Sequence, residues 1–178
     1  MIQNDTIRLR AVEPADVDLL YSWENNMDLW QVSNTIAPFS KAQLARYVKN
    51  AALDIYQTKQ LRLMIDALKE DRVDETVGII DMFDFDPYHN RAGVGIMINR
   101  KWSGRGLAAS ALRLFMDYAF NTLHLHQLYC NIAASNSPSI RLFETAGFKP
   151  VGGKKDWLKA GTGYEDELLF QCLSTLER

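Results

Sequence analysis

This sequence of 178 residues is poor in the features that mark several specialised classes of protein. It has two cysteines, Cys130 and Cys172, each alone in an apolar run, which argues against a disulfide framework or a zinc site and favours buried thiols. No apolar run approaches membrane-spanning length, and the N-terminus lacks the apolar core of a signal peptide. We therefore expect a cytoplasmic protein with no membrane partner and no metal.

Charge of one sign is not in large excess either. The formal net charge at pH 7 is −2, which excludes the general basic footprint of a nucleic-acid-binding protein and leaves only a local basic patch open. Low-complexity segments, internal repeats and Pro/Ser-rich linkers are also absent. With 47% hydrophobic and 24% charged residues, the chain is expected to fold as one globular domain over residues 1–178.

Hydrophobic periodicity predicts the order of the elements. Alternation with a period of two predicts strands, and apolar residues at helical spacing predict helices. The expected strands are 6–12, 61–68, 76–85, 92–99, 127–134, 148–158 and 164–173, and the expected helices are 13–26, 37–53, 106–123 and 137–147.

The connections between these elements predict the fold class. Short connections favour antiparallel hairpins up to residue 99. A whole helix separates strand 92–99 from strand 127–134, so these two strands should be parallel and linked by a crossover. We expect an α+β (mixed α/β) fold with a central mixed sheet of six to seven strands, mostly antiparallel, flanked by about four helices.

The stretch SGRGLAAS, residues 103–110, lies where a strand passes into a helix. Gly104 and Gly106 would let the backbone approach a ligand, and amides at a helix N-terminus favour an anion such as pyrophosphate. Arg105, with Arg100 before it, supplies the positive charge that a polyphosphate needs. The alternative is that Gly104 only turns the chain and that Arg105 is a solvated surface residue.

GRGLAA also fits the GxGxxA fingerprint of dinucleotide-binding folds. That fingerprint expects an acidic residue at the end of the next strand, about 20 residues on. The following strand, QLYCNIAASN, has none, and the motif comes after several hairpins rather than in an opening βαβ unit. Hydride transfer is therefore the weaker interpretation of this loop.

Two longer stretches carry a more specific resemblance. IMINRKWSGRGLAASALRLFMDYAF and LYCNIAASNSPSIRLFETAGFKPVG resemble the two cofactor motifs of the GCN5-related N-acetyltransferase (GNAT) superfamily. The resemblance covers residues 6–172 and is strongest at 77–153, the expected cofactor-binding core. The opening IRLRAVEPADVDLLYSWENN and the APFS stretch are similar to the branch that contains polyamine acetyltransferases and the N-terminal acetyltransferases of ribosomal proteins.

The resemblance implies a GNAT-like sheet whose parallel pair is splayed, with acetyl-CoA as co-substrate and no metal. In the family the glycine loop holds the pyrophosphate, and the preceding strand, here Gly95 to Asn99, pairs with the pantetheine arm. Family members are often dimers or larger rings, so a homo-oligomer is left open. Carried over residue by residue, the implied cofactor contacts are Met97, Ile98, Arg100, Ser103, Gly104, Arg105, Gly106, Leu107, Ala108, Asn131, Asn136, Ser139 and Arg141.

This chain departs from the family at three positions. Ser103 stands where the family often has glutamine or arginine, which removes a side-chain donor but no backbone amide. Phe143 stands where the family commonly has the tyrosine that protonates the departing thiolate, and phenylalanine has no proton to donate. Gly93 stands where a glutamate is a frequent general base. The hydroxyl groups that would replace the missing tyrosine are those of Ser137, Ser139 and Tyr164.

Asp81 and Asp84, in GIIDMFDFD, are the expected catalytic carboxylates. By the resemblance they lie on the strand that borders the acceptor cleft, where one would accept a proton from the amine, directly or through water. Their opposite parity means that both face the cleft only if a bulge separates them. The alternative for either aspartate is a solvated or salt-bridged side chain.

The expected function is acetyl transfer from acetyl-CoA to a primary amine of a small molecule or a peptide. A polyamine such as spermidine is slightly preferred because carboxylates gather in the segments expected to frame the cleft, namely Glu24, Asp28, Asp81, Asp84 and Asp86. N-terminal acetylation of a ribosomal protein is the alternative acceptor. A coenzyme A sensor without turnover is the alternative from another class, and Phe143 and Gly93 support it.

Overall fold

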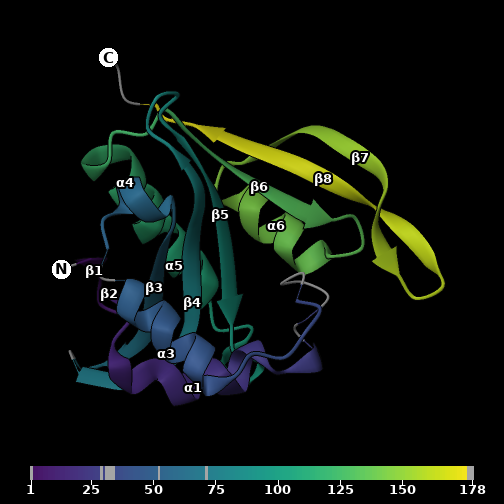
Figure 1. The fold of residues 1–178 in the computed structure, drawn as a ribbon. Coiled ribbons are helices and arrows are strands. Elements are labelled where there is room, and N and C mark those ends of the chain that lie inside the picture. The colour runs from purple at the N-terminus through teal and green to yellow at the C-terminus, as the bar shows by residue number, and fades with distance from the viewer. Residues whose placement is uncertain (1, 29, 31–34, 52, 71, 176–178) are drawn as a thin grey trace.

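One mixed sheet organises the protein, and helices pack on both of its faces (Figure 1). The computed structural model describes residues 2–28, 30, 35–51, 53–70 and 72–175. The strands are β1 (Ile2–Gln3), β2 (Ile7–Ala11), β3 (Leu61–Lys69), β4 (Arg72–Asp86), β5 (Arg91–Ile98), β6 (Gln127–Ala133), β7 (Lys149–Ala160) and β8 (Gly163–Leu173). Within these residues the order is β1-β2-β3-β4-β5-β6-β8-β7, and β5 and β6 are the one parallel pair. The expected fold class is confirmed, with β1 as a strand beyond the seven expected.

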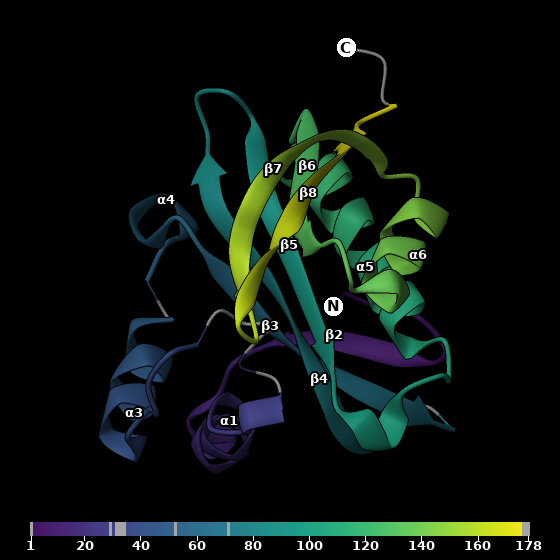
Figure 2. The ribbon, with the colours of Figure 1, turned by 90° about the vertical axis from the view of Figure 1, so that its right-hand side faces the viewer.

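The helices divide between the two faces of the sheet. Those that the described residues contain are α1 (Val17–Glu24), α3 (Lys41–Asn50), α4 (Ile55–Thr58), α5 (Leu107–Asp117) and α6 (Ser137–Thr145), with the 3-10 turns η1 (Pro14–Asp16) and η2 (Arg100–Trp102) and the π-helical turn η3 (Tyr118–Thr122). Figure 2 shows α5 and α6 on one side of the sheet and α1 and α3 on the other. None of these helices is long and apolar enough to cross a membrane.

Amphipathic patterning explains this sandwich. α5 buries Leu112 and Phe115 in the larger apolar cluster of the sheet. On the opposite face, Trp23 of α1 and Leu44 of α3 pack with Met64 of β3 in a second cluster. Each side chain of this size stabilises the fold by about 1.5–3 kcal/mol when it is buried. The sheet is therefore fixed from both sides, and the loops at its ends are held in place.

β5 and β6 pair only over a short stretch and then diverge. Their paired residues run from Arg91 with Gln127 to Gly93 with Tyr129. Beyond Tyr129, β6 continues to pair with β8 on its other edge, while β5 continues to pair with β4 (Figure 1). This is the splayed parallel pair that the family resemblance implies. Among the described residues, the divergence leaves the last residues of β5 without a strand partner on the side that faces β6.

A β-bulge interrupts β4 near its end. The pairing register with β5 shifts between Phe83 and Asp86, and Asp84 adopts a positive φ of 50°. Aspartate tolerates this left-handed conformation better than most residues because its short side chain bonds locally. The bulge that Asp81 and Asp84 would need in order to share a face is therefore present.

Candidate active site

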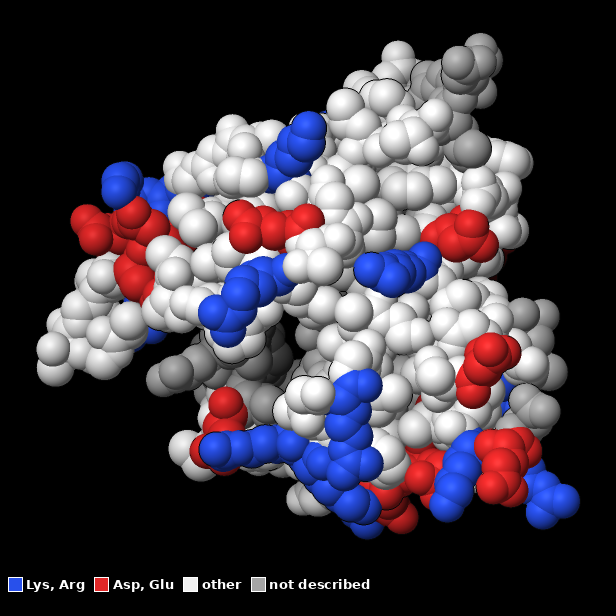
Figure 3. All heavy atoms as spheres, turned by 180° about the vertical axis from the view of Figure 1, so that it is seen from behind, with Lys and Arg blue, Asp and Glu red and all other residues white. Residues whose placement is uncertain are grey.

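A cleft of about 1090 Å³ lies between the diverging strands β5 and β6. Its walls come from β5, the loop before α5, β6 and α6 on one side, and from α1, α3 and β3 on the other. Figure 3 shows the molecule from behind, where the surface is hollowed beneath the projecting β7–β8 hairpin and Lys and Arg side chains lie along the lower rim of the hollow. The cleft is thus continuous from the glycine loop to the helices that cover the opposite face of the sheet.

The double-glycine loop forms one end of the cleft. Gly104 and Gly106 both have φ of 77°, a conformation that L side chains rarely adopt. A Cβ atom placed on either would meet no other atom within 4 Å, so the space beside them is open. Gly106 is the N-cap of α5, whose first amides have no intrahelical partner and lie at the positive end of the helix dipole. The loop therefore has the form of an anion cradle, as the expected role in binding a pyrophosphate requires.

Most of the cofactor contacts implied by the resemblance meet in this cleft. The implied residues that line it are Met97, Ile98, Ser103, Gly104, Arg105, Gly106, Leu107, Ala108, Asn131, Asn136 and Ser139. Arg100 and Arg141 are not among the lining residues. The same wall also contains Ile132, Ala133 and Pro138, which were not predicted as site residues because their apolar side chains give no chemical signal in the sequence.

Arg105 is held over an indole ring at the mouth of the cleft. Its guanidinium lies 4.5 Å from the centre of the Trp102 ring, a cation–π distance. Next to it, Lys101 Nζ lies 2.6 Å from Glu75 Oε2, and this hydrogen bond lowers the pKa of Glu75. Lys101 is therefore already paired, whereas Arg105 keeps its hydrogen-bond donors beside the glycine loop.

The open edge of β5 supplies backbone donors along the cleft. The Asn99 amide donates to the Val77 carbonyl of the β4 side at 2.7 Å. Because amides alternate along an antiparallel strand, those of Ile96 and Ile98 point the other way, toward the gap before β6. Met97 and Ile98 are both implied cofactor contacts, and of these two the alternation favours Ile98 as the residue whose amide faces the cleft.

An arginine bound by two carboxylates occupies the other half of the cleft. Arg62 of β3 holds Asp81 of β4 with two parallel hydrogen bonds, Nε to Oδ1 at 2.7 Å and Nη2 to Oδ2 at 2.8 Å. Its Nη1 donates to Glu24 Oε1 of α1 at 2.5 Å. Burial opposes the charge on Arg62, but the attraction and hydrogen bonds of Asp81, with Glu24, hold its pKa above the ordinary value. We call Arg62, Asp81 and Glu24 the cleft triad.

Aromatic side chains line the cleft, and one of them lies against the cleft triad. The Arg62 guanidinium lies 5.3 Å from the centre of the Tyr47 ring, and burial raises the pKa of that tyrosine. Phe83 lines the same half of the cleft. A Cβ on Gly93 would lie 2.2 Å from the Phe83 ring, so Phe83 fills the place of any side chain at position 93. The glutamate that the family often carries there has no room in this chain.

Asp84 lies outside the cleft. It is exposed, and its Oδ2 accepts a hydrogen bond from the Tyr129 hydroxyl at 3.1 Å. Burial and this hydrogen bond raise the pKa of Tyr129 to about 12. Asp86, another expected carboxylate, pairs with Arg91 at 3.2 Å, and Asp28 is exposed. The structure therefore brings Asp81 and Glu24 into the cleft but not the other three acidic residues.

Phe143 of α6 lines the cleft where the family commonly has tyrosine. Its ring is 2% exposed and packs edge-on against Phe148 at a centroid distance of 5.0 Å. Cys130 lines the same region, and burial raises the pKa of its thiol to about 12. Of the three hydroxyl groups considered as replacements, only that of Ser139 belongs to a lining residue in the described part of the chain. Tyr164 is 65% exposed on β8.

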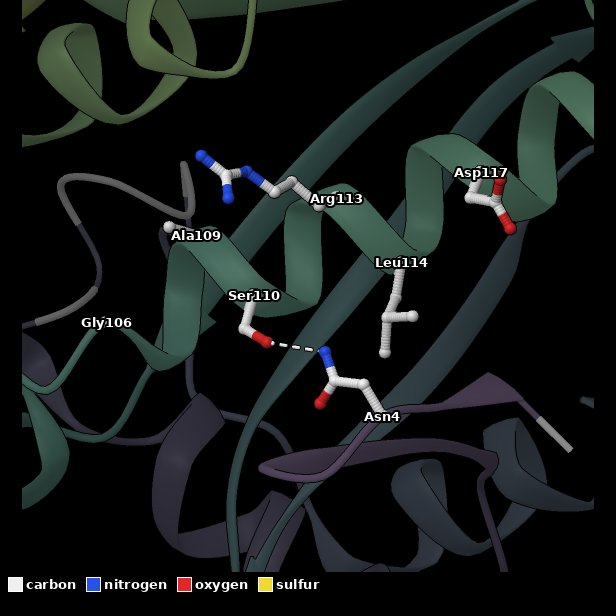
Figure 4. A pocket seen from close by; sticks show the side chains of 7 residues that line it. All are labelled: Asn4, Gly106, Ala109, Ser110, Arg113, Leu114 and Asp117. Carbon is white, nitrogen blue, oxygen red and sulfur yellow. Dashed lines mark hydrogen bonds between the residues drawn. The ribbon is translucent and has the colours of Figure 1, made fainter.

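A second hollow of about 420 Å³ follows the outer face of α5 (Figure 4). Ser110 Oγ accepts a hydrogen bond from Asn4 Nδ2 at 2.9 Å across it, and Arg113 points away from this pair. Apart from Gly106, none of the residues predicted for the site lines this hollow. The candidate chemistry is therefore confined to the larger cleft.

The chain is similar to known acetyltransferases over most of its length. Residues 6–149 match the acetyltransferase (GNAT) domain family. The uncharacterized N-acetyltransferase p20 of Bacillus licheniformis is 27% identical over 172 residues, 97% of this chain and 95% of the relative. The spermidine N(1)-acetyltransferase of Vibrio cholerae is 25% identical over 152 residues, 84% of this chain and 82% of the relative. Among solved structures, spermidine N-acetyltransferase from Vibrio cholerae in complex with CoA and spermine superposes with a TM-score of 0.84 at 23% identity, over 96% of each chain.

Proposed function

Because this chain belongs to the acetyltransferase (GNAT) family, we propose that it transfers an acetyl group from acetyl-CoA to a primary amine, with a polyamine such as spermidine as the preferred acceptor. One observation carries the proposal: a single cleft joins the double-glycine loop, which suits a diphosphate, to the cleft triad, which carries more negative than positive charge. The spermidine acetyltransferase among the relatives supports the choice of acceptor.

The donor half of the cleft binds acetyl-CoA and orients its thioester. Amides at the start of α5, with Gly104 and Gly106 leaving room, hold the diphosphate, and Arg105 adds charge beside them. The open edge of β5 pairs with the amide-bearing arm of the cofactor as a further strand would. The bound thioester supplies an activated acetyl group. The amide of Ile98 or of Ile96 donates a hydrogen bond to the carbonyl oxygen where negative charge develops.

The acceptor half attracts and deprotonates the amine. An amine with an ordinary pKa of ~10.4 is almost fully protonated at neutral pH, and freeing it at pH 7 costs about 4.6 kcal/mol. Of the two expected aspartates we assign the role of proton acceptor to Asp81, because it lines the cleft and Arg62 fixes its orientation. Each Asp81 oxygen keeps a second lone pair after bonding Arg62, so it can accept the proton directly or through water.

Because residue 143 is phenylalanine and not tyrosine, the departing sulfur of coenzyme A lacks the proton donor that is common in the family. A thiol with a pKa near ~8.5 departs tolerably as the thiolate, so deprotonation of the amine is the more demanding step. Positioning the two reactants contributes up to roughly 7–11 kcal/mol. Phe143 nevertheless favours a second candidate function, a coenzyme A sensor that binds without turnover.

Release of free thiol from acetyl-CoA separates these functions. Purified protein is assayed with spermidine, with a simple monoamine and with a peptide that begins with alanine. Thiol release with spermidine at the lowest KM supports the proposal, and release with the peptide alone supports N-terminal acetylation. Calorimetric binding of coenzyme A with no release for any acceptor supports the sensor. Light scattering on the same sample tests whether the protein forms a homo-oligomer.

A further inference from the structure

We propose that Arg62 sets the charge that the acceptor site accepts: it acts as a built-in counter-cation, so that one cationic nitrogen neutralises the cleft triad and the attraction of the triad for a second nitrogen nearby is weakened. This inference rests on the proposed function, because it concerns how the amine acceptor is chosen. Arg62 is a specificity-determining and positioning residue in this account and takes no part in proton transfer itself.

The charge count of the triad is the first argument. Glu24 and Asp81 carry two negative charges and Arg62 one positive charge, so the triad has a net charge of −1 and is one positive charge short of neutrality. Other charges nearby do not alter this balance much. Glu167 in the cleft is paired with Lys154 at 2.6 Å, and Arg46 is exposed, where water and salt screen its field. One ammonium therefore neutralises the site.

The burial of Arg62 is the second argument. Its side chain is 16% exposed, and those of its partners Glu24 and Asp81 are 14% and 29% exposed. With three hydrogen bonds to two carboxylates and the Tyr47 ring beside it, the guanidinium is held in one place. A flexible surface arginine could swing away from an incoming cation, whereas this one stays. Its field repels a second cationic nitrogen at close range.

The remaining hydrogen-bond capacity is the third argument. Glu24 accepts from Arg62 through Oε1, which leaves Oε2 for another donor. Asp81 keeps one lone pair on each oxygen after the paired bonds. An ammonium has three donors and fits these acceptors, while the aromatic rings of Tyr47 and Phe83 pack against the carbon chain that follows. The chemistry selects an amine with one cationic nitrogen here and an apolar spacer behind it.

The test compares two acceptors of equal length that differ by one charge, propylamine and 1,3-diaminopropane. Steady-state KM and kcat are measured for the wild type and for the variants Arg62→Gln, Glu24→Gln and Arg62→Lys. Arg62→Gln makes the triad more negative, so we expect the ratio of the diamine KM to the monoamine KM to fall by about tenfold or more. Glu24→Gln makes it less negative, so the same ratio should rise.

Arg62→Lys is the matched control because it keeps the charge and loses the paired geometry. It should leave the KM ratio near that of the wild type even if kcat falls. Equal changes in KM for both acceptors in Arg62→Gln and Glu24→Gln would overturn the inference, since a purely structural role moves both acceptors together. Should Arg62→Gln fail to fold, the Glu24→Gln and Arg62→Lys ratios decide alone. No turnover by the wild type with any amine would overturn the proposed function, and calorimetric binding of the two amines to the four proteins would then decide the inference separately.

Discussion

β3 carries two arginine–carboxylate clusters on one face, and they differ in charge balance. Arg62, Met64 and Asp66 are alternate residues of this strand, so their side chains lie on the same side of the sheet. Arg62 belongs to the cleft triad. Asp66 belongs to a second cluster, which we call the β3 network: it accepts from Arg8 at 2.7 Å, from Arg10 at 3.0 Å and from Thr76 at 2.8 Å.

The β3 network is internally complete. Arg10 also holds Asp16 through two hydrogen bonds at 2.7 and 2.9 Å, so two arginines face two aspartates. The Asp66 side chain is 1% exposed and that of Asp16 is 8% exposed. A charge-balanced set whose carboxylates are buried and already bonded does not offer net charge to a ligand. The cleft triad, with one negative charge in excess and free lone pairs, does. The difference indicates that the net charge of the cleft triad favours binding of a ligand, whereas the balanced charges of the β3 network stabilise the fold.

Breaking the β3 network should give the largest loss of stability. Asp66→Asn leaves Arg8 without its carboxylate and removes one of the two that hold Arg10, and loss of one partner of a buried pair costs ~3–5 kcal/mol. Urea unfolding measures the change. The control is Asp74→Asn at an exposed position of β4, which should stay within about 0.5 kcal/mol of the wild type. A loss below about 1 kcal/mol for Asp66→Asn would contradict the structural role.

Breaking the cleft triad should instead lower activity. Asp81→Asn removes the proposed proton acceptor, and general-base catalysis contributes about 10²–10⁴-fold, so we expect kcat to fall by at least about 100-fold. The affinity for coenzyme A, measured by calorimetry, should not change, because the donor half of the cleft is untouched. Unchanged turnover in Asp81→Asn would remove this residue from the mechanism.

The pH dependence of stability gives a finer test of the β3 network. Burial works to raise the pKa of Asp16, but the hydrogen bonds from Arg10 and from the Glu13 amide outweigh it and hold the pKa below its ordinary value. A lowered pKa in the folded state means stabilisation that is complete above the ordinary pKa and lost as pH falls through the lowered one. Asp16→Asn should therefore cost about 2 kcal/mol at neutral pH and progressively less in acid, by urea unfolding at each pH. A difference that grows in acid would contradict this sign.

The smallest effect is expected at Glu24. Glu24→Gln neutralises the excess charge of the cleft triad but leaves Asp81 in place, so the KM for spermidine should rise about tenfold while kcat changes little. Steady-state kinetics at two salt concentrations measure the KM of both proteins. The difference in KM between the wild type and Glu24→Gln should shrink at high salt, because screening weakens the attraction between the triad and the cationic acceptor. A fall in kcat with constant KM would show instead that Glu24 acts in the chemical step.

Local sequence signals predicted much of the fold. Serine is a favoured N-cap residue, and within the expected helix 37–53 the Ser40 Oγ accepts from the Gln43 amide at 3.1 Å at the start of α3. The helix between strands 92–99 and 127–134 required a parallel crossover, which β5 and β6 confirm. These features depend on residues close in sequence or on the length of a connection, so the sequence alone carries them.

The acceptor half of the cleft was harder to predict. Arg62 lies 38 residues from Glu24 and 19 from Asp81 along the chain, and a charged residue inside a strand resembles any solvent-facing one. The bulge at Asp84 depends on a positive φ, and because this residue is not a glycine the sequence gives no sign of it. The cofactor half was more accessible because Gly104 and Gly106 stand out by residue type. Pairing between side chains that are far apart in the sequence gives no comparable signal in the residue types.

The most direct test of acetyl transfer in this cleft is mass spectrometry of spermidine after incubation with acetyl-CoA. Wild-type protein should yield monoacetylated spermidine in equal amount to the free thiol released. Gly106→Val, which forces a β-branched side chain into a φ of 77°, should abolish the product, whereas Gly152→Ala, at an open position of ordinary φ in β7, should retain it. Equal yields from Gly106→Val and Gly152→Ala, or no acetylated spermidine from the wild type, would contradict the account.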